Sequence, residues 1–291
     1  MINHPSTSAL DVTMSPVGES EHHRPPVGLE HLSLRQEPLP VFVAAAAAGG
    51  AGSVCLSVNH PDVVDRKVLR EALARLDALN IPVAMGDGFI LRAGGDLDGL
   101  RRQLDVLAET RAPLANACAF EPDVQVARDP ALVADLLGEF CGVARTAQVD
   151  VLLEFTPLSH VPSLAAAVGL LEQLDQPNLR ILLDTLHLVR AGEGPTDVRE
   201  IDQQLIGYCQ LSDGLLVSES LSAYLDEAVN DRLVPGQGEF PLVEILALIP
   251  REATISAEVP LQRLERAGIP PHERAHRILE ASRRVVAEAW T

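Results

Sequence analysis

The sequence predicts a parallel (β/α)8 barrel, or TIM barrel, formed by a single domain over residues 27–291 and preceded by a flexible N-terminal tail over residues 1–26. Three observations lead to this fold class. From residue 27 onward, short apolar or β-branched runs alternate with longer amphipathic runs, as in repeated βα units around a parallel sheet. The short runs number eight, which is the strand count of a closed barrel. The 291 residues also suit one domain, because such barrels typically have about 250 residues.

Each expected strand is a short run with an apolar core. The eight runs are residues 27–34, 52–58, 82–91, 113–120, 150–155, 178–184, 207–213 and 253–259. Segments between them, such as DRKVLREALARLDAL, carry apolar residues at positions i, i+3, i+4 and i+7, which predicts helices. The last such segment, PHERAHRILEASRRVVAEAW, is expected to close the ring. RQEPLP follows the first strand where an open dinucleotide-binding sheet would carry a glycine-rich turn, so that fold is not expected.

The first 26 residues differ in composition from the rest of the chain. They are rich in proline, serine and histidine and show neither a helix period nor a strand period. Their two adjacent histidines, His22 and His23, are expected to be solvated rather than bound to a metal. We therefore expect a tail outside the barrel.

The charge balance argues against polyanionic partners. The chain has 41 acidic and 23 basic residues, a formal charge of −18, and such a field repels nucleic acid and anionic membrane surfaces. We therefore expect no nucleic-acid partner and no membrane partner. Lys67 is the only lysine, and its neighbours form an exposed helical pattern. Schiff-base chemistry, which needs a desolvated lysine amine, is accordingly not expected.

The four cysteines are spread along the chain without a C-x-x-C pair. They are Cys55, Cys118, Cys141 and Cys209, and three lie within expected strands. This distribution favours reduced core residues in a reducing compartment. No run approaches the ~18 apolar residues of a membrane span, and the first residues lack the charged and apolar regions of a signal peptide. A cytoplasmic location is the resulting expectation.

Polar residues end four successive expected strands. Glu154 ends the fifth, Asp184 the sixth, Gln210 and Asp213 lie in the seventh, and Glu258 is near the end of the eighth. In a parallel barrel the carboxyl ends of all strands meet at one mouth, where the functional loops converge. We expect these oxygen atoms to face one another there.

A divalent cation would resolve the repulsion among these groups. Two carboxylates ~4 Å apart repel each other by about 4 kcal/mol at an effective dielectric constant of 20, and burial adds a desolvation cost. Carboxylates with one amide oxygen suit Mn²⁺, Mg²⁺ or Co²⁺, with Zn²⁺ as an alternative. We expect Glu154, Asp184, Gln210 and Glu258 to bind one such ion. For any single acid the alternatives are a helix N-cap or a salt bridge.

Three histidines are candidates for the same site. His187 follows Asp184 at i+3 and is expected to orient a substrate oxygen, to hydrogen-bond a ligand, or to be structural. His160 lies in the loop after the fifth strand and either contacts substrate or stabilises that loop. His31, within the first expected strand, points into the barrel mouth or belongs to a satisfied polar layer. We expect His31 and His160 to bind substrate.

The long segment between the seventh and eighth strands offers one more candidate. Arg232 precedes a PGQG turn and Glu239, which suggests an ordered loop. Arg232 is expected to clamp an anionic or hydroxyl-rich substrate, with a surface arginine as the alternative reading.

Over roughly residues 27–285 these patterns resemble the sugar phosphate isomerase/epimerase family, the xylose isomerase-like TIM barrels of AP endonuclease family 2. The resemblance rests on LLEFTPLSHVPSLAAAVGLLEQLDQPNLRILLDTLHLVRAG, YCQLSDG, RLVPGQGEFPLVEIL and ISAEVP, in this order. It implies one metal ion on the four residues named above, with His187 beside it. Many relatives have histidine where this chain has Gln210. In having glutamine at this position, the chain resembles the dehydroshikimate dehydratase-like branch of the family. The histidines that a three-zinc nuclease would place after the seventh strand are absent from SDGLLVSES.

These pieces imply a proton-transfer mechanism. The metal would polarise a carbonyl while Glu154 or Glu258 removes a proton from the adjacent carbon, giving an enediolate. Reprotonation gives epimerisation or aldose–ketose isomerisation, and loss of a β-hydroxyl gives dehydration. The leading hypothesis is an isomerase or epimerase of a small carbohydrate or keto-polyol. The alternatives are a dehydratase and a non-catalytic sugar-binding barrel. For the oligomeric state, a homodimer is an open option.

Overall fold

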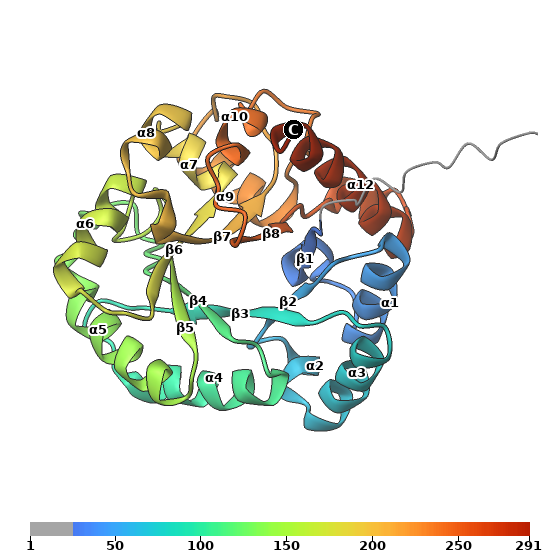
Figure 1. Cartoon of the computed structure of the whole chain (residues 1–291), viewed down its shortest axis with the longest axis horizontal. Helices are drawn as coiled ribbons and strands as arrows, with labels where there is room; N and C mark the ends of the chain where they lie inside the picture. Colours follow the sequence, from blue (N-terminus) through green and yellow to red (C-terminus); the bar gives the residue numbers. More distant parts are fainter. Residues whose placement is uncertain (1–25) are drawn as a thin grey trace, which may run out of the picture.

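The computed structural model of this chain describes residues 26–291. The tail expected over residues 1–26, including His22 and His23, therefore lies outside the described residues except for Pro26. The described part of the chain is a closed barrel with helices around it (Figure 1).

Eight parallel strands close the barrel in sequence order, and β8 pairs with β1. Their bounds are β1 Gly28–Glu30, β2 Val54–Ser57, β3 Val83–Ile90, β4 Leu114–Cys118, β5 Asp150–Glu154, β6 Leu179–Asp184, β7 Ile206–Leu211 and β8 Thr254–Ala257. Every strand lies within or overlaps the run predicted for it, so the fold class is confirmed. The short apolar runs form strands because a parallel sheet covered by helices is buried on both faces.

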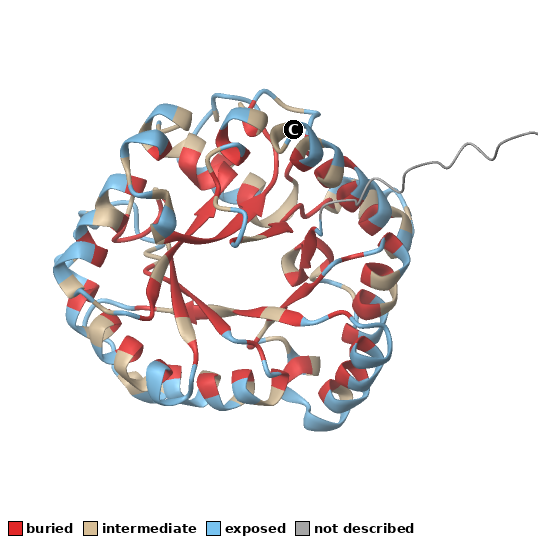
Figure 2. Ribbon diagram, in the orientation of Figure 1, coloured by how far each residue is buried: buried red, intermediate tan, exposed pale blue. Residues whose placement is uncertain are grey.

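Helices surround the barrel and cover its outer face (Figure 2). Their bounds are α1 Leu39–Gly49, α2 Pro61–Val64, α3 Arg66–Ala78, α4 Leu97–Thr110, α5 Ala131–Thr146, α6 Leu164–Leu174, α7 Thr185–Arg190, α8 Pro195–Glu200, α9 Leu221–Asn230, α10 Leu242–Leu246, α11 Gln262–Arg266 and α12 Pro271–Ala289, with 3-10 helices η1 His31–Leu34 and η2 Gln203–Leu205. The last helix, α12, packs against α1 and so completes the ring, as the sequence predicted. None of the helices in the described residues is both long and apolar enough to cross a membrane.

The prediction that the first strand runs over residues 27–34 is wrong in its second half. The strand ends at Glu30, and His31 opens the 3-10 helix η1 instead of lying within a strand. The hydroxyl of Ser33 donates to the carbonyl of Ala257 and accepts from the amide of Val259, at 3.1 and 2.9 Å. These bonds tie η1 to the end of β8 and turn the chain before it reaches α1.

All four cysteines are free and buried, as the sequence predicted. Cys55, Cys118 and Cys209 lie on strands, and Cys141 lies on the inner side of α5. Burial raises the pKa of each thiol, because a thiolate loses its hydration in an apolar surrounding. The thiols therefore remain protonated packing residues.

One buried carboxylate organises the long loop between α9 and α10. Asp213, just after β7, accepts backbone N–H groups from Gly214, Gly236, Gly238 and Phe240 at 2.8 to 3.1 Å. A Cβ at Gly238 would lie 2.3 Å from the Asp213 carboxylate, so this approach requires glycine. The backbone of the predicted PGQG turn is thus hydrogen-bonded to the Asp213 carboxylate. These hydrogen bonds fix the position of the segment that carries Arg232.

We predict that Asp213→Ala lowers the free energy of unfolding by about 2 to 4 kcal/mol, because four backbone donors lose a buried, charged acceptor. Urea denaturation followed by circular dichroism measures this change. Asp105→Ala, on the exposed side of α4, is the control and should stay within about 0.5 kcal/mol of wild type. Equal losses in the two variants would contradict the role of Asp213.

Candidate metal centre

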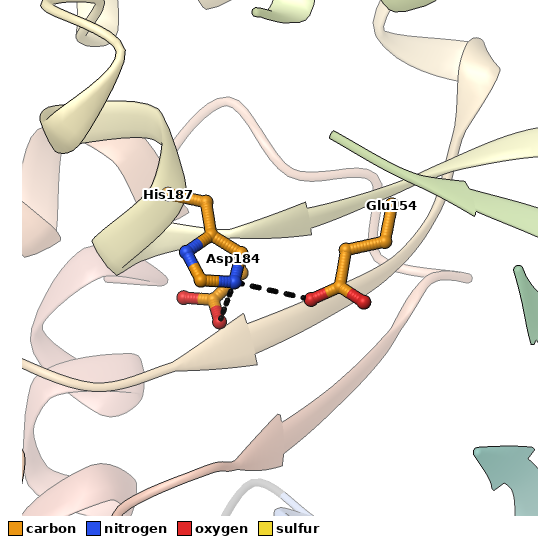
Figure 3. A group of neighbouring side chains, drawn as sticks. All are labelled: Glu154, Asp184 and His187. Carbon is orange, nitrogen blue, oxygen red and sulfur yellow. Dashed lines mark ion pairs between the residues drawn. The ribbon is translucent and has the colours of Figure 1, made fainter. Parts of the chain in front are cut away.

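Three potential metal ligands meet at the carboxyl ends of β5 and β6. Glu154 is the last residue of β5, Asp184 the last of β6, and His187 lies in the first turn of α7. One donor atom from each lies within 4.8 Å of the others. Figure 3 shows the imidazole between the two carboxylates, with Nε2 at 3.3 Å from Glu154 Oε1 and 3.6 Å from Asp184 Oδ2. The structure thus brings together three of the residues that the sequence proposed.

Asp184 is fixed from two sides and is fully buried. Its Oδ1 accepts the amide of Leu186 at 2.8 Å and thereby caps the N-terminus of α7, which also sets the position of His187. Its Oδ2 lies 2.7 Å from Arg232 Nη1. Burial opposes ionisation, but the Arg232 guanidinium and His187 hold the pKa of Asp184 below its ordinary value. Asp184 is therefore an ionised carboxylate. It caps α7 and forms an ion pair with Arg232, in addition to its proposed role as a metal ligand.

Arg232 is buried between two of the predicted metal ligands. Its Nη1 contacts Asp184 and its Nη2 lies 2.7 Å from Glu258 Oε2, while Nε donates to the carbonyl of Ala228. Burial would lower the pKa of this guanidinium, but the two carboxylates raise it. The sequence could not distinguish a substrate clamp from a surface arginine, and the surface reading is excluded because the side chain is only 2% exposed.

Gln210 and Glu258 form the other half of the predicted ligand set. Gln210 pairs with Asp184 across β6 and β7, and its Nε2 donates to Glu258 Oε1 at 3.1 Å. Its Oε1 is buried and has no hydrogen-bond partner. Burial raises the pKa of Glu258 well above its ordinary value, although Arg232 acts in the opposite direction. This buried amide oxygen lies among carboxyl groups and has no hydrogen-bond partner. It is therefore a suitable ligand atom for a hard cation.

Further polar residues of the mouth were not predicted from the sequence. Asn116, on β4, donates through Nδ2 to Asp87 at 3.1 Å and to Glu154 Oε2 at 2.8 Å. Glu30, at the end of β1, accepts the hydroxyl of Tyr208 at 2.6 Å. Both residues lie in the middle of the expected strand runs 113–120 and 27–34, so the strand-end signal that identified Glu154 did not point to them.

The mouth gathers more acid than base. Burial and the neighbouring charges of Glu154 and Glu30 raise the pKa of Asp87 to about 7, and burial also raises the pKa of Glu30. The excess of carboxyl groups and the unpaired oxygen of Gln210 both fit the binding of a divalent cation at this site.

A cavity of about 330 Å³ opens on this cluster. Its polar wall consists of Asp87, Asn116, Glu154, Thr156, His187, Tyr224, Arg232 and Glu258. The rest of its wall consists of Leu32, Gly88, Phe89, Ile90, Cys118, Phe120, Leu158, Leu225, Ala228 and Val229. A space of this size with a few convergent polar groups suits a small molecule.

His31 is not among the residues that line this cavity. Its Nδ1 accepts the amide of Ser57 at 3.3 Å, and its ring packs against Phe42 and His60 with centroid distances of 4.6 Å. Burial and the proximity of His60 lower its pKa to about 3, so the ring is neutral. The ring is buried beside the mouth and its Nε2 has no hydrogen-bond partner, and the expectation that His31 binds substrate stays a prediction.

His160 is also absent from the cavity wall. It is 1% exposed, accepts the amide of Asp129 through Nδ1 at 3.5 Å, and lies with Nε2 3.8 Å from Glu121. Its own amide donates to the carbonyl of Ala119. These contacts join the loops after β4 and β5, and the expectation that His160 binds substrate stays a prediction.

The fold and this cluster define a TIM barrel with a candidate metal site at the carboxyl ends of its strands. The chain belongs to the xylose isomerase-like TIM barrel family, whose profile matches residues 42–284. The family resemblance inferred from the sequence is therefore confirmed.

Individual relatives differ in their described activities. A 3-dehydroshikimate dehydratase of Pseudomonas aeruginosa is 26% identical over 159 residues, which cover 54% of this chain and only 24% of that protein. The structure of the IOLI protein with a bound zinc atom is 15% identical, with a TM-score of 0.71 over 90% of this chain and 98% of that one. D-psicose 3-epimerase from Clostridium cellulolyticum H10, solved with D-tagatose, is 15% identical, with a TM-score of 0.68 over 90% and 99%. At these identities the two structures show the shared fold.

The raised pKa of Asp87 predicts a pH-dependent loss of stability. In the unfolded chain this carboxyl ionises near 3.8, whereas in the folded protein its pKa is about 7. Between these values the folded protein holds a proton that the unfolded chain has lost, so stability falls as the pH rises from about 4 to about 7. Asp87→Asn should reduce this pH-dependent decrease in the free energy of unfolding by roughly 1 to 3 kcal/mol.

Urea denaturation at pH 4.5 and pH 8, in the presence of a chelator, measures this effect. The matched variant Asp105→Asn, on the exposed side of α4, should keep the wild-type pH dependence. An Asp87→Asn protein with an unchanged pH dependence would rule out the assignment.

Proposed function

We propose that this protein is a divalent-metal-dependent isomerase or epimerase that moves a proton on a small carbohydrate or keto-polyol. The observation that carries this proposal is the cluster of Glu154, Asp184 and His187, which opens on a cavity that Glu258 also lines. Membership of the xylose isomerase-like family supports it, and so does the similarity to an epimerase solved with a ketose. The four free thiols agree with work in the cytoplasm.

The proposed ligands are Glu154, Asp184, Gln210 and Glu258, with His187 Nε2 directed at the same space. The unpaired Oε1 of Gln210 and the surplus of carboxyl groups support this set. The ion is Mn²⁺, Mg²⁺ or Co²⁺, or alternatively Zn²⁺, because the donors are mostly oxygen. When bound, such an ion polarises a substrate carbonyl and stabilises negative charge on its oxygen.

The chain's own residues would then perform the proton transfer. Glu154, held by Asn116, and Glu258, held by Arg232 and Gln210, lie on β5 and after β8, so their carboxyl groups reach the cavity from different strands. One removes the proton from the carbon beside the carbonyl, and the other returns a proton to the opposite face. The imidazole of His187 orients a substrate oxygen, and Arg232 keeps Glu258 in position and contributes its positive charge to the cavity wall.

A dehydratase is the second candidate function. The similarity to a 3-dehydroshikimate dehydratase over about half of this chain favours it specifically. The same carboxyl groups would remove the proton, and the reaction would differ in the loss of a β-hydroxyl group as water. The two functions therefore share the first step and differ in the product.

We predict that the protein, purified without chelator and supplied with Mn²⁺, binds one ion per chain. Glu154→Gln and Asp184→Asn should each weaken binding by at least ~10-fold to ~100-fold, because each removes an anionic donor. Elemental analysis and titration calorimetry measure this. Glu172→Gln, on the exposed side of α6, should bind as wild type does. Failure of the wild-type protein to bind any of the four ions would exclude the proposed centre.

We predict that the loaded enzyme exchanges deuterium from D2O into the carbon beside the carbonyl of a small ketose panel, as followed by ¹H NMR. Glu154→Gln and Glu258→Gln should each lower this rate by about 10² to 10⁴ if proton transfer is carried by these groups. Glu172→Gln is again the control. Accumulation of a dehydrated product from cyclic keto-polyols, without exchange, would favour the dehydratase. Unchanged turnover in both glutamine variants, with the fold intact, would defeat the assignment of the two carboxyl groups.

A further inference from the structure

A second cavity lies outside the strands of the barrel, where α2 and α4 flank the end of β3. Figure 1 shows both helices outside the ring of strands. The cavity has a volume of about 580 Å³, which exceeds the 330 Å³ of the cavity at the mouth. Its described lining includes none of the proposed metal ligands or acid–base groups. The proposed reaction therefore does not use this space.

Two arginine side chains in the wall of this outer cavity have no acidic partner. Arg92 lies in the loop after β3 and Arg102 lies in α4. Among the described residues, neither guanidinium has a hydrogen-bond or ion-pair partner. Arg111 and Arg190, by contrast, pair with carboxylates at 2.8 and 2.7 Å. The N–H donors of Arg92 and Arg102 are therefore available to a ligand, and a guanidinium group can only donate hydrogen bonds.

The local charge of the outer cavity is opposite to that of the whole chain. The chain has a formal charge of −18, whereas the charged residues in the cavity wall are two arginines and one aspartate, Asp96. The Asp96 carboxylate is engaged elsewhere, because its Oδ1 accepts the amide of Asp98 at 3.0 Å and caps α4. A small anion is repelled by most of the protein surface and attracted to this cavity.

Hydrogen bonds among its own residues hold the wall of the outer cavity in place. Asn59 Nδ2 and Gln103 Nε2 both donate to the carbonyl of Gly88, at 2.8 and 2.9 Å. Gly88 has a φ of +109°, and a Cβ there would lie 2.4 Å from Asn59 Nδ2, so this approach requires glycine. The amide of Gly95 donates to the carbonyl of Arg92 at 2.9 Å and closes the turn before α4. The cavity is thus formed before a ligand arrives, which lowers the cost of binding.

Apolar side chains form another part of the same wall. Val64, on α2, is 53% exposed, and Leu100 and Val106 contribute from α4. Small-molecule sites combine apolar walls of this kind with a few placed polar groups. The exposed valine offers a surface for the apolar part of a ligand, and the two arginines offer donors for its charged part.

We propose that the outer cavity binds a small organic anion, whose phosphate or carboxylate group contacts Arg92 and Arg102 and whose apolar part packs against Val64. Guanidinium groups bind such anions through paired, charge-assisted hydrogen bonds. The site is separate from the candidate metal centre, and the inference does not depend on the proposed function.

The two cavities adjoin each other across one strand. Gly88 and Ile90, both in β3, line the outer cavity as well as the cavity at the mouth. An anion could also bind to a cation at the mouth, so the test has to separate the two places. Glu154→Gln alters the candidate metal centre and leaves the outer cavity as it is, and this variant should bind the anion as the wild-type protein does.

The test is titration calorimetry of the full chain with phenyl phosphate, benzoate and the neutral compound phenyl β-D-glucoside. At least one of the two anions should bind with a dissociation constant below about 1 mM, and the glucoside should bind more weakly. Tighter binding of phenyl phosphate identifies a phosphate site, and tighter binding of benzoate identifies a carboxylate site.

Arg92→Gln and Arg102→Gln should each weaken binding of the preferred anion by about 10-fold to 100-fold, because each removes charge-assisted hydrogen bonds. Both side chains are exposed and without partners, so the fold should survive, which circular dichroism verifies. Arg75→Gln is the matched control, because it removes an equal charge from the exposed side of α3. Val64→Ser should weaken binding of phenyl phosphate about 3-fold to 10-fold, because the phenyl group loses an apolar contact.

Three results would overturn the proposal. The first is that neither anion binds to the wild-type protein. The second is that Arg92→Gln and Arg102→Gln bind the anion as tightly as Arg75→Gln does. The third is that Glu154→Gln abolishes binding, which would place the anion at the mouth. Unchanged affinity in Val64→Ser would overturn the assignment of the apolar wall.

Discussion

The mouth of the barrel depends on the ion pairs of one arginine. Arg232 is the one lysine or arginine among the described residues that line the cavity, and it lies between Asp184 and Glu258. Carboxylates on neighbouring strands repel each other, and the cost grows as water is excluded. The guanidinium compensates part of this repulsion with two contacts of 2.7 Å. The remaining excess of acid is what makes the site suited to a second positive charge.

The position of that arginine is in turn set by backbone hydrogen bonds. Arg232 precedes Leu233, whose amide and carbonyl pair with the backbone of Asp213, and the Asp213 carboxylate gathers the following turn around itself. Asp213 lies two residues after the end of β7, so the rigid sheet transmits its geometry to a loop that has no regular structure of its own. A carboxylate outside the proposed ligand set thus determines where the positive charge of the site lies.

Much of the fold and part of the site follow from the sequence, for physical reasons. Apolar runs of strand length identify buried parallel strands, and the topology then places the polar residues at their ends at one rim, which is how Glu154 and Asp184 were found. Contacts made by loops and helices carry no such periodic signal. The burial of Arg232 between two acids and the approach of Tyr224 to His187 depend on how α9 and its loop pack, and the sequence pattern does not encode that packing directly. His31 was misplaced because HLSL satisfies strand alternation and a 3-10 turn equally well.

The bonds of Ser33 on both sides of Glu258 have a consequence for biosynthesis. A residue near the start of the barrel holds Ala257 and Val259, so the last acid of the mouth is oriented by the first strand region. During translation this acid emerges after Glu154 and Asp184, which precede it in the chain. Until β8 joins β1, a nascent chain presents its other carboxylates without their final partner. Binding of a divalent cation at the proposed metal centre would therefore indicate that β8 has joined β1.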